Sequence, residues 1–114
     1  LQLAKGAIAS GVAILMKDLG ITADDLDCVF MAGAFGNYVN PKSAKRIGMV
    51  PNVPTERIIG VGNAAGAAAQ MALLSLDKRE EAMRILDQAI FVELSAREDF
   101  ADEFMNSMYF PQID

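Results

Sequence analysis

The first twenty residues carry apolar side chains at intervals that are typical of a helix. The repeat is one apolar or small residue in every four: Leu3, Ala7, Gly11, Leu15 and Leu19. This spacing predicts a helix over residues 2–19 that ends at Gly20, because glycine is favoured just after a helix. Few positions around this helix are polar, so we expect it to have neighbours on most sides. Thr22 can cap a short helical turn that follows.

Two near-continuous apolar runs come next, over residues 27–32 and 57–61. Such runs are typical of parallel strands that are buried on both faces. Each run ends in a glycine turn that opens a helix. The first turn spans residues 33–37, and a short helix follows it from Asn40-Pro41 to Gly48. The second turn is Gly62-Asn63, and an alanine-rich helix over residues 64–76 follows it.

The remaining residues predict two helices and a third strand. Asp77 is expected to cap a helix with an apolar face, and residues 90–94 predict the strand. Ser95 is expected to cap a final helix that carries Phe100, Phe104 and Met108 on one stripe. The order α-β-α-β-α-α-β-α indicates an α/β fold with few, mainly parallel strands covered by helices.

The composition excludes several kinds of site. The 114 residues fit one domain and include no His and a single Cys, Cys28. A Ser-His-Asp triad, a His-activated Cys and a His-ligated zinc are therefore excluded. An internal disulfide is excluded too, as is an iron–sulfur cluster held by this chain alone, since a cluster needs about four thiolates. We expect a reducing, cytoplasmic setting.

The net charge of −5 is concentrated at the C-terminal end. Residues 1–92 carry nine basic and nine acidic side chains, so the last 22 residues hold the whole excess. No basic run is present that would bind a nucleic-acid backbone. The uncharged stretch 58–76 is rich in Ala and Gly, which drive membrane insertion weakly. We therefore expect neither a nucleic acid nor a membrane as partner, and a docked C-terminal helix with a negative outer surface.

The sequence opens with Leu1 already inside a helical pattern. A protein rarely starts in the middle of a buried helix, so we expect residues 1–114 to be a single subdomain of a longer chain. The thin predicted sheet agrees with this expectation if further strands lie upstream of Leu1.

The two glycine turns allow three interpretations. Glycine and free N–H groups at a helix start favour a bound phosphate or ribose, but any strand-to-helix turn also favours glycine for purely structural reasons. Residues 60–66 give the spacing G-x-G-x-x-x-G, one residue longer than the dinucleotide fingerprint, and the required acidic strand is missing. The P-loop pattern is absent. The third interpretation takes the two turns together as parts of one nucleotide site.

Two segments carry that third interpretation. Residues 29–36 (VFMAGAFG) resemble the adenosine motif of the actin, sugar-kinase and heat-shock-chaperone ATPase superfamily. Residues 62–69 (GNAAGAAA) resemble its second connecting helix, at the hinge between two lobes. More closely, residues 1–8, 32–38, 62–66 and 102–105 resemble the C-terminal domain of the reductive activators of corrinoid proteins, over nearly the whole chain.

This resemblance implies a parent protein with an N-terminal [2Fe-2S] ferredoxin domain and this ATPase-type domain. Such a parent uses ATP and Mg²⁺ to reduce an inactive Co(II) corrinoid to Co(I) in corrinoid methyl-transfer proteins. Its implied partners are the upstream domains of its own chain and a corrinoid protein or corrinoid methyltransferase, with a homodimer left open. The phosphate-binding hairpins and cluster cysteines would lie upstream, so this chain alone should be inactive.

The resemblance also gives the candidate site residues, which are nucleotide-binding and include no catalytic or metal-binding residue. They are Gly33, Ala34, Phe35, Gly36, Asn37, Gly62 and Asn63. Ala34 departs from the superfamily, in which many members have a second glycine there. The alternative is a non-catalytic structural or docking module.

The structural interpretations of single residues also stay open. Phe35 is a core residue or an adenine-stacking ring, and Asn37 is a turn former or a ribose ligand. Cys28 is expected to be inert core, and Lys5 to be either a snorkelling lysine or a ligand contact.

Overall fold

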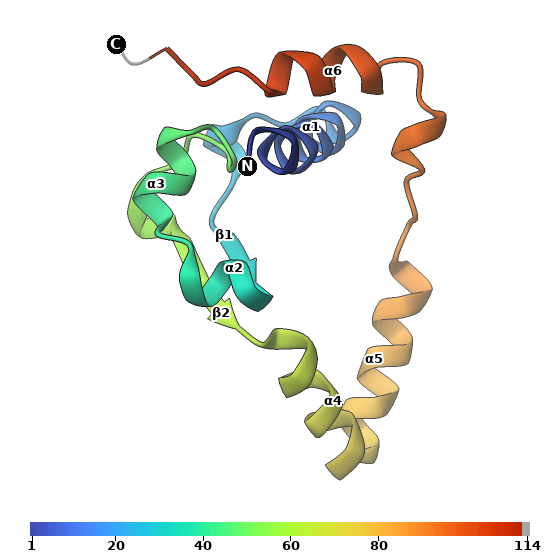
Figure 1. Cartoon of the computed structure of the whole chain (residues 1–114). Helices are drawn as coiled ribbons and strands as arrows, with labels where there is room; N and C mark the ends of the chain where they lie inside the picture. The colour runs from blue at the N-terminus through green and yellow to red at the C-terminus, as the bar shows by residue number, and fades with distance from the viewer. Residues whose placement is uncertain (113–114) are drawn as a thin grey trace.

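A computed structural model describes residues 1–112 and folds them as helices around a two-stranded parallel sheet (Figure 1). The elements in chain order are α1 (Gln2–Leu19), η1 (Ala23–Asp25), β1 (Val29–Ala32), α2 (Gly33–Tyr38), α3 (Pro41–Arg46), η2 (Thr55–Arg57), β2 (Ile58–Gly62), α4 (Ala64–Leu74), α5 (Leu76–Gln88), η3 (Leu94–Ala96) and α6 (Phe100–Ser107). The segments η1, η2 and η3 are short 3₁₀ helices. The predicted α/β class is confirmed.

Local capping signals place several element ends where the sequence predicts them. Gly20 ends α1 in the left-handed conformation, with φ 66°. Thr22 and Asp25 cap η1 reciprocally, since the Thr22 N–H donates to the Asp25 carboxylate over 2.8 Å. The side chain of Asn40 accepts from the Ser43 N–H over 3.2 Å and starts α3.

The core lies where the sheet meets α3 and the loop that follows α3. β1 and β2 pair in parallel, with Val29 opposite Ile58 and Phe30 opposite Ile59. The buried core residues are Met31, Ala44, Met49, Val53 and Ile58, and Ile8 and Val50 pack against them from the side. One face of the sheet is therefore covered.

The other face of the sheet is bare, which corrects the prediction of strands buried on both faces. Phe30 is 63% exposed, and Ile59 and Val61 are each 41% exposed. Since side chains alternate along a strand, these residues belong to the side away from Met31 and Ile58. Residues 1–112 supply no layer that buries them.

Four further predictions are wrong in detail. Residues 90–94 form no strand: this segment runs away from β1 and β2, and Ile90 and Phe91 are exposed beside no partner strand (Figure 1). Residues 33–37 are not a turn but most of helix α2. Ser75, not Asp77, caps α5, because its hydroxyl oxygen accepts from the Lys78 N–H. The last helix begins at Phe100, well after Ser95.

Helices α4 and α5 form a hairpin that extends from the rest of the chain, and neither contains a buried residue (Figure 1). With this hairpin, the molecule is elongated and measures 49 × 31 × 26 Å along its principal axes. The radius of gyration is 15.9 Å, against about 13 Å for a compact chain of this length. Within residues 1–112, no helix combines the length and apolar character that crossing a membrane requires.

Helix α6 lies across α1 and closes the chain on itself, as the prediction of a docked C-terminal helix requires (Figure 1). Gly6 makes room for this contact, since an added Cβ would lie 2.9 Å from Met108 Cγ. Lys5 is only 2% exposed, and its ammonium donates to the carbonyl oxygens of Ser107 and Tyr109 (2.6 Å for Tyr109). Lys5 thus neither snorkels nor faces a ligand; it caps the C-terminal end of α6.

The opposite end of α6 is held by ion pairs to the last turn of α1. Arg97 pairs with both Asp18 and Asp99, and Lys17 pairs with Asp99 over 3.0 Å. The guanidinium of Arg97 and the ammonium of Lys17 hold the pKa of the Asp99 carboxyl well below its usual range. We call Lys5, Lys17, Asp18, Arg97 and Asp99 the α1–α6 clasp.

We expect Lys5→Met to destabilise the protein by about 1–3 kcal/mol, because two carbonyl groups lose their charged donor in a part-buried position. Urea unfolding measures this difference, and Lys42→Met, at an exposed position of α3, is the matched control. A Lys5→Met variant as stable as the control would show that the buried ammonium is not needed.

The stability that Asp99 contributes should depend on pH. Its pKa in the folded protein lies below the unfolded value of about 3.9, so its contribution is complete above that value. It is lost as the pH falls through the folded-state pKa. The difference in unfolding free energy between wild type and Asp99→Asn should therefore be constant from about pH 5 to 8 and shrink below about pH 4. A difference that persists unchanged at about pH 2 would contradict this assignment.

Candidate functional site

The candidate site is the edge at which both strands end. In a parallel pair the carboxyl ends lie side by side, and here Ala32 is opposite Gly62 after a register shift between Met31 and Ala32. Helix α2 starts directly after Ala32, and α4 starts after Asn63. All seven predicted residues therefore lie at or next to this edge, brought there from two segments of the chain.

Two of the predicted glycines have backbone conformations that other residues rarely adopt. Gly33 has φ 66° and Gly62 has φ 64°. A Cβ added to Gly33 would meet nothing within 4 Å, whereas one added to Gly62 would lie 3.2 Å from Asn37 Oδ1. The space beside Gly33 is therefore open to solvent or to a ligand, and the glycine is required there by its backbone conformation.

Gly36 and Gly60 bring α2 against the sheet with no side chain between them. A Cβ on Gly36 would overlap the Met31 carbonyl oxygen and lie 2.9 Å from the Gly62 nitrogen. A Cβ on Gly60 would in turn overlap the Gly36 carbonyl oxygen. The sequence predicts that the glycines let a ligand come close to the backbone. At Gly36, the atoms that come close belong to the backbone of β1 and β2 instead.

Asn63 is engaged as the N-cap of α4. Its Oδ1 accepts from the Gly66 N–H over 2.9 Å, and a Cβ on Gly66 would lie only 2.8 Å from the Asn63 Cγ. The Asn63–Gly66 pair therefore has a structural role at the start of α4. Other N–H groups of the first turn of α4 have no partner within the helix.

Phe35 lies beside an apolar hollow of about 210 Å³ at the same edge. The hollow is lined by residues of α1, β1, α2 and the loop after α3: Ile8, Val12, Val29, Phe30, Met31, Ala32, Phe35, Met49, Val50 and Pro51. Phe35 is 45% exposed, so it is not a buried core residue. Ala34 is exposed next to it.

Asn37 borders a different and more polar hollow of about 370 Å³, together with Gly36, Asn40 and Gly60. The predicted residues thus surround one strand edge but line two hollows. Phe35 and Asn37 do not share a cavity.

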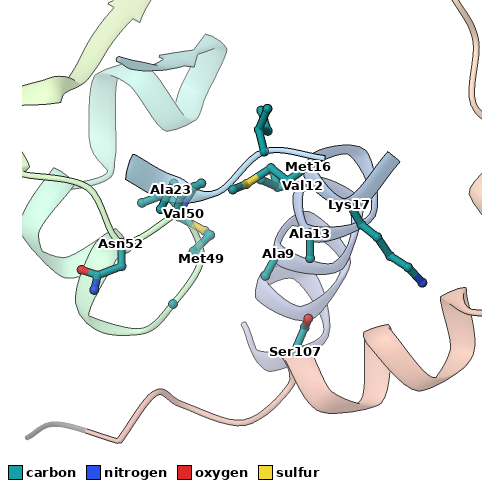
Figure 2. Close-up of a pocket in the computed structure, with 13 residues that line it drawn as sticks. Ala9, Val12, Ala13, Met16, Lys17, Ala23, Met49, Val50, Asn52 and Ser107 are labelled. Atoms are coloured by element: carbon teal, nitrogen blue, oxygen red, sulfur yellow. The ribbon is translucent and has the colours of Figure 1, made fainter. Parts of the chain in front are cut away.

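Sequence reasoning missed a third hollow, of about 480 Å³, between α1 and residues 48–52 (Figure 2). It shares Val12, Met49, Val50 and Pro51 with the Phe35 hollow. Its walls are mainly apolar, and Figure 2 shows Lys17 extending away from Met49 and Val50. The apolar residues Met49 and Val50 next to Pro51 are the only signal for this hollow in the sequence.

None of the seven residues predicted for the strand edge carries an acidic, basic or thiol side chain. Among residues 1–112, no three Cys, Asp or Glu side chains gather to hold a metal ion. Cys28 is a free, partly buried thiol. The edge therefore has the features of a binding surface: open backbone, helix starts and an apolar hollow.

The chain is similar to known proteins over most or all of its length. A family model described as the C-terminal domain of RACo, the ASKHA domain, matches residues 1–114. The corrinoid activation enzyme RamQ of Eubacterium limosum is 36% identical over 109 residues, which are 95% of this chain and 18% of that protein. A [Co(II) methylated amine-specific corrinoid protein] reductase of Methanosarcina barkeri is 32% identical over 80 residues, 70% of this chain and 15% of the reductase.

A solved structure has the same fold over the whole chain. It is a reductive activator for corrinoid, iron-sulfur protein, which superposes with a TM-score of 0.89 at 34% sequence identity. The match covers 100% of this chain and 18% of the solved one. The chain thus spans less than a fifth of the length of the relatives that it matches.

Gly36→Ala and Gly33→Ala should differ in cost because their surroundings differ. At Gly33 the only penalty is the left-handed backbone, roughly 1–2 kcal/mol. At Gly36 a Cβ meets backbone atoms that cannot rotate away, so we expect about 3 kcal/mol or more. Urea unfolding of the two variants tests this order. Equal costs would mean that α2 can lift from the sheet.

Proposed function

This chain belongs to the family of C-terminal RACo domains, the ASKHA domain, and on that premise we propose that it forms the adenosine side of an ATP site. The parent protein, on this proposal, is an ATP-dependent reductive activator that restores Co(I) in a corrinoid protein. The names of two relatives, a corrinoid activation enzyme and a corrinoid protein reductase, support this assignment. The family membership supports the use of a nucleotide.

One observation carries the assignment of the site: Ala32 and Phe35, which lie on either side of the open Gly33 in the chain, both line one apolar hollow. The hollow, about 210 Å³, is smaller than the roughly 300–1,000 Å³ of complete small-molecule sites. It suits the base of a nucleotide rather than the whole molecule. The base would lie against Phe35 and Pro51, and the sugar would pass close to the backbone at Gly33.

The contacts already described give each residue at the strand edge a separate role in the proposed site. Gly36 and Gly60 hold α2 on the sheet, which fixes the position of Phe35. Asn63 fixes the start of α4. The remaining N–H groups at this start, together with the positive N-terminal end of the helix dipole, would favour an oxygen of the sugar or phosphates. Asn37 approaches Gly62 and would limit the site on that side.

The residues of this chain do not fit the other groups of the proposed parent. No cluster of potential metal ligands occurs within residues 1–112, so Mg²⁺ and the phosphates need ligands from elsewhere in the parent. A [2Fe-2S] cluster needs about four thiolates, and Cys28 is the only cysteine. We assign no step of electron transfer or ATP hydrolysis to this chain.

The alternative is a structural or docking module that binds no nucleotide. The packing roles of Gly36 and Asn63 favour it, because each explains a motif residue without a ligand. The backbone conformation of Gly33 likewise requires glycine without a ligand. What favours the nucleotide site is the position of Gly33 in the chain, between Ala32 and Phe35, which both line the apolar hollow.

Calorimetry of ATP-Mg²⁺ binding to the full-length parent distinguishes the two functions. We expect Gly33→Val to weaken binding at least about tenfold, because the side chain would occupy the open space beside the hollow. Gly20→Val is the matched control, since Gly20 has the same φ of 66° and equally open surroundings at the end of α1. Both substitutions strain the backbone, and only one adjoins the site. Equal affinity of the two variants, or no binding by the wild type, would favour the docking module.

A further inference from the structure

The chain after α6, residues 108–112, passes α1 and reaches the start of the loop that follows α3 (Figure 1). We call this segment the C-terminal tail. Its path is fixed first by Lys5, whose ammonium donates to the carbonyl oxygens of Ser107 and Tyr109 on either side of Met108. Because Lys5 is buried, the tail leaves α6 in a direction that a side chain of α1 sets from inside.

The path of the tail is fixed a second time where Pro111 meets Gly48. A Cβ added to Gly48 would lie 2.7 Å from Pro111 Cγ and 2.9 Å from Pro111 Cδ. The Cε atom of Lys5 would lie 3.6 Å from the same Cβ. The ring of proline is rigid and cannot rotate away from such a contact. The missing side chain of Gly48 therefore lets the tail rest directly on the backbone of the loop.

Gly48 begins the loop that forms one wall of the apolar hollow proposed for the base. The three residues after it, Met49, Val50 and Pro51, all line that hollow. The core holds this loop through the buried side chains of Met49 and Val53. Val50 and Pro51, between these two anchors, are only partly buried. A displacement at Gly48 would therefore move the wall of the hollow, to which it is bonded directly.

We propose that Lys5, Gly48 and Pro111 are positioning residues for the nucleotide site, because they brace the C-terminal tail against the loop and so set the place of residues 49–51. The identity of the ligand rests on the proposed function, whereas the brace itself does not. None of the three residues lines the apolar hollow, so each acts on a bound base only through the wall.

The alternative is that the contact of the tail with Gly48 contributes to stability alone. Pro111 is exposed, so its replacement removes little buried surface and leaves the urea midpoint of unfolding unchanged. A role in packing alone predicts no effect beyond the contact. A positioning role predicts a looser loop and weaker nucleotide binding at an unchanged midpoint.

Hydrogen exchange of the full-length parent without nucleotide measures the brace. The amides of Met49 and Val53 report on the loop, because each donates to a backbone carbonyl oxygen over 2.9 Å. We expect Pro111→Ala to accelerate their exchange at least about tenfold. The matched control is Pro54→Ala, an exposed proline close by that touches neither the tail contact nor the hollow, and it should change their exchange by less than about twofold. Unchanged exchange in Pro111→Ala would overturn the proposal.

Calorimetry of ATP-Mg²⁺ binding to the same variants tests the link between the brace and the site. We expect Pro111→Ala to weaken binding about three- to tenfold, and Pro54→Ala to bind as the wild type does. Gly48→Ala disturbs the same contact, so the double variant with Pro111→Ala should bind about as weakly as Gly48→Ala alone. Should Gly48→Ala fail to fold, the Pro111→Ala variant still decides.

The two measurements separate failure of the brace from failure of the proposed function. Faster exchange in the loop together with an unchanged affinity for ATP would overturn the positioning role. A wild-type parent that binds no ATP would contradict the proposed function instead. The exchange of Met49 and Val53 would then still decide whether the tail positions the loop, since that measurement needs no nucleotide.

Discussion

The direct backbone contact between Gly36 and the two strands determines how the rest of the strand edge is built. No side chain separates α2 from β2. The helix α2, which follows β1 directly, can therefore pack its backbone at Gly36 against Gly62 at the end of β2. Phe35 and Asn37 flank that contact and are therefore directed into different hollows. The strand edge thus separates an apolar hollow from a polar one.

Elements with a local cause could be predicted from the sequence. The helix α1 ends at Gly20 and α3 begins at Asn40, as predicted, since each cap is made by residues only a few positions apart. The two strands and the family were also recognisable, because apolar runs followed by glycine motifs survive in order along the chain. The predicted site residues do gather at one edge, for the general reason that parallel strands end together.

Features that depend on distant contacts could not be predicted in this way. The pattern around Lys5 suggests a snorkelling lysine, since nothing nearby reveals that carbonyls more than a hundred positions away will meet its ammonium. Residues 90–94 have the apolar character of a strand but no strand beside them. Phe30 and Leu73 lie in apolar segments that are typical of buried elements, yet both side chains are exposed. Their burial would need contacts that residues 1–112 do not make.

The contact of Lys5 with Ser107 spans 102 positions and has a consequence for biosynthesis. A ribosome releases α1 long before α6, so α1 must wait with its contact face open while almost the whole domain is translated. Closing so long a loop carries an entropic cost that only the completed clasp recovers. Nascent chains that stall before residue 107 would therefore expose α1, and quality-control factors that recognise apolar helices would have a defined interval in which to bind them.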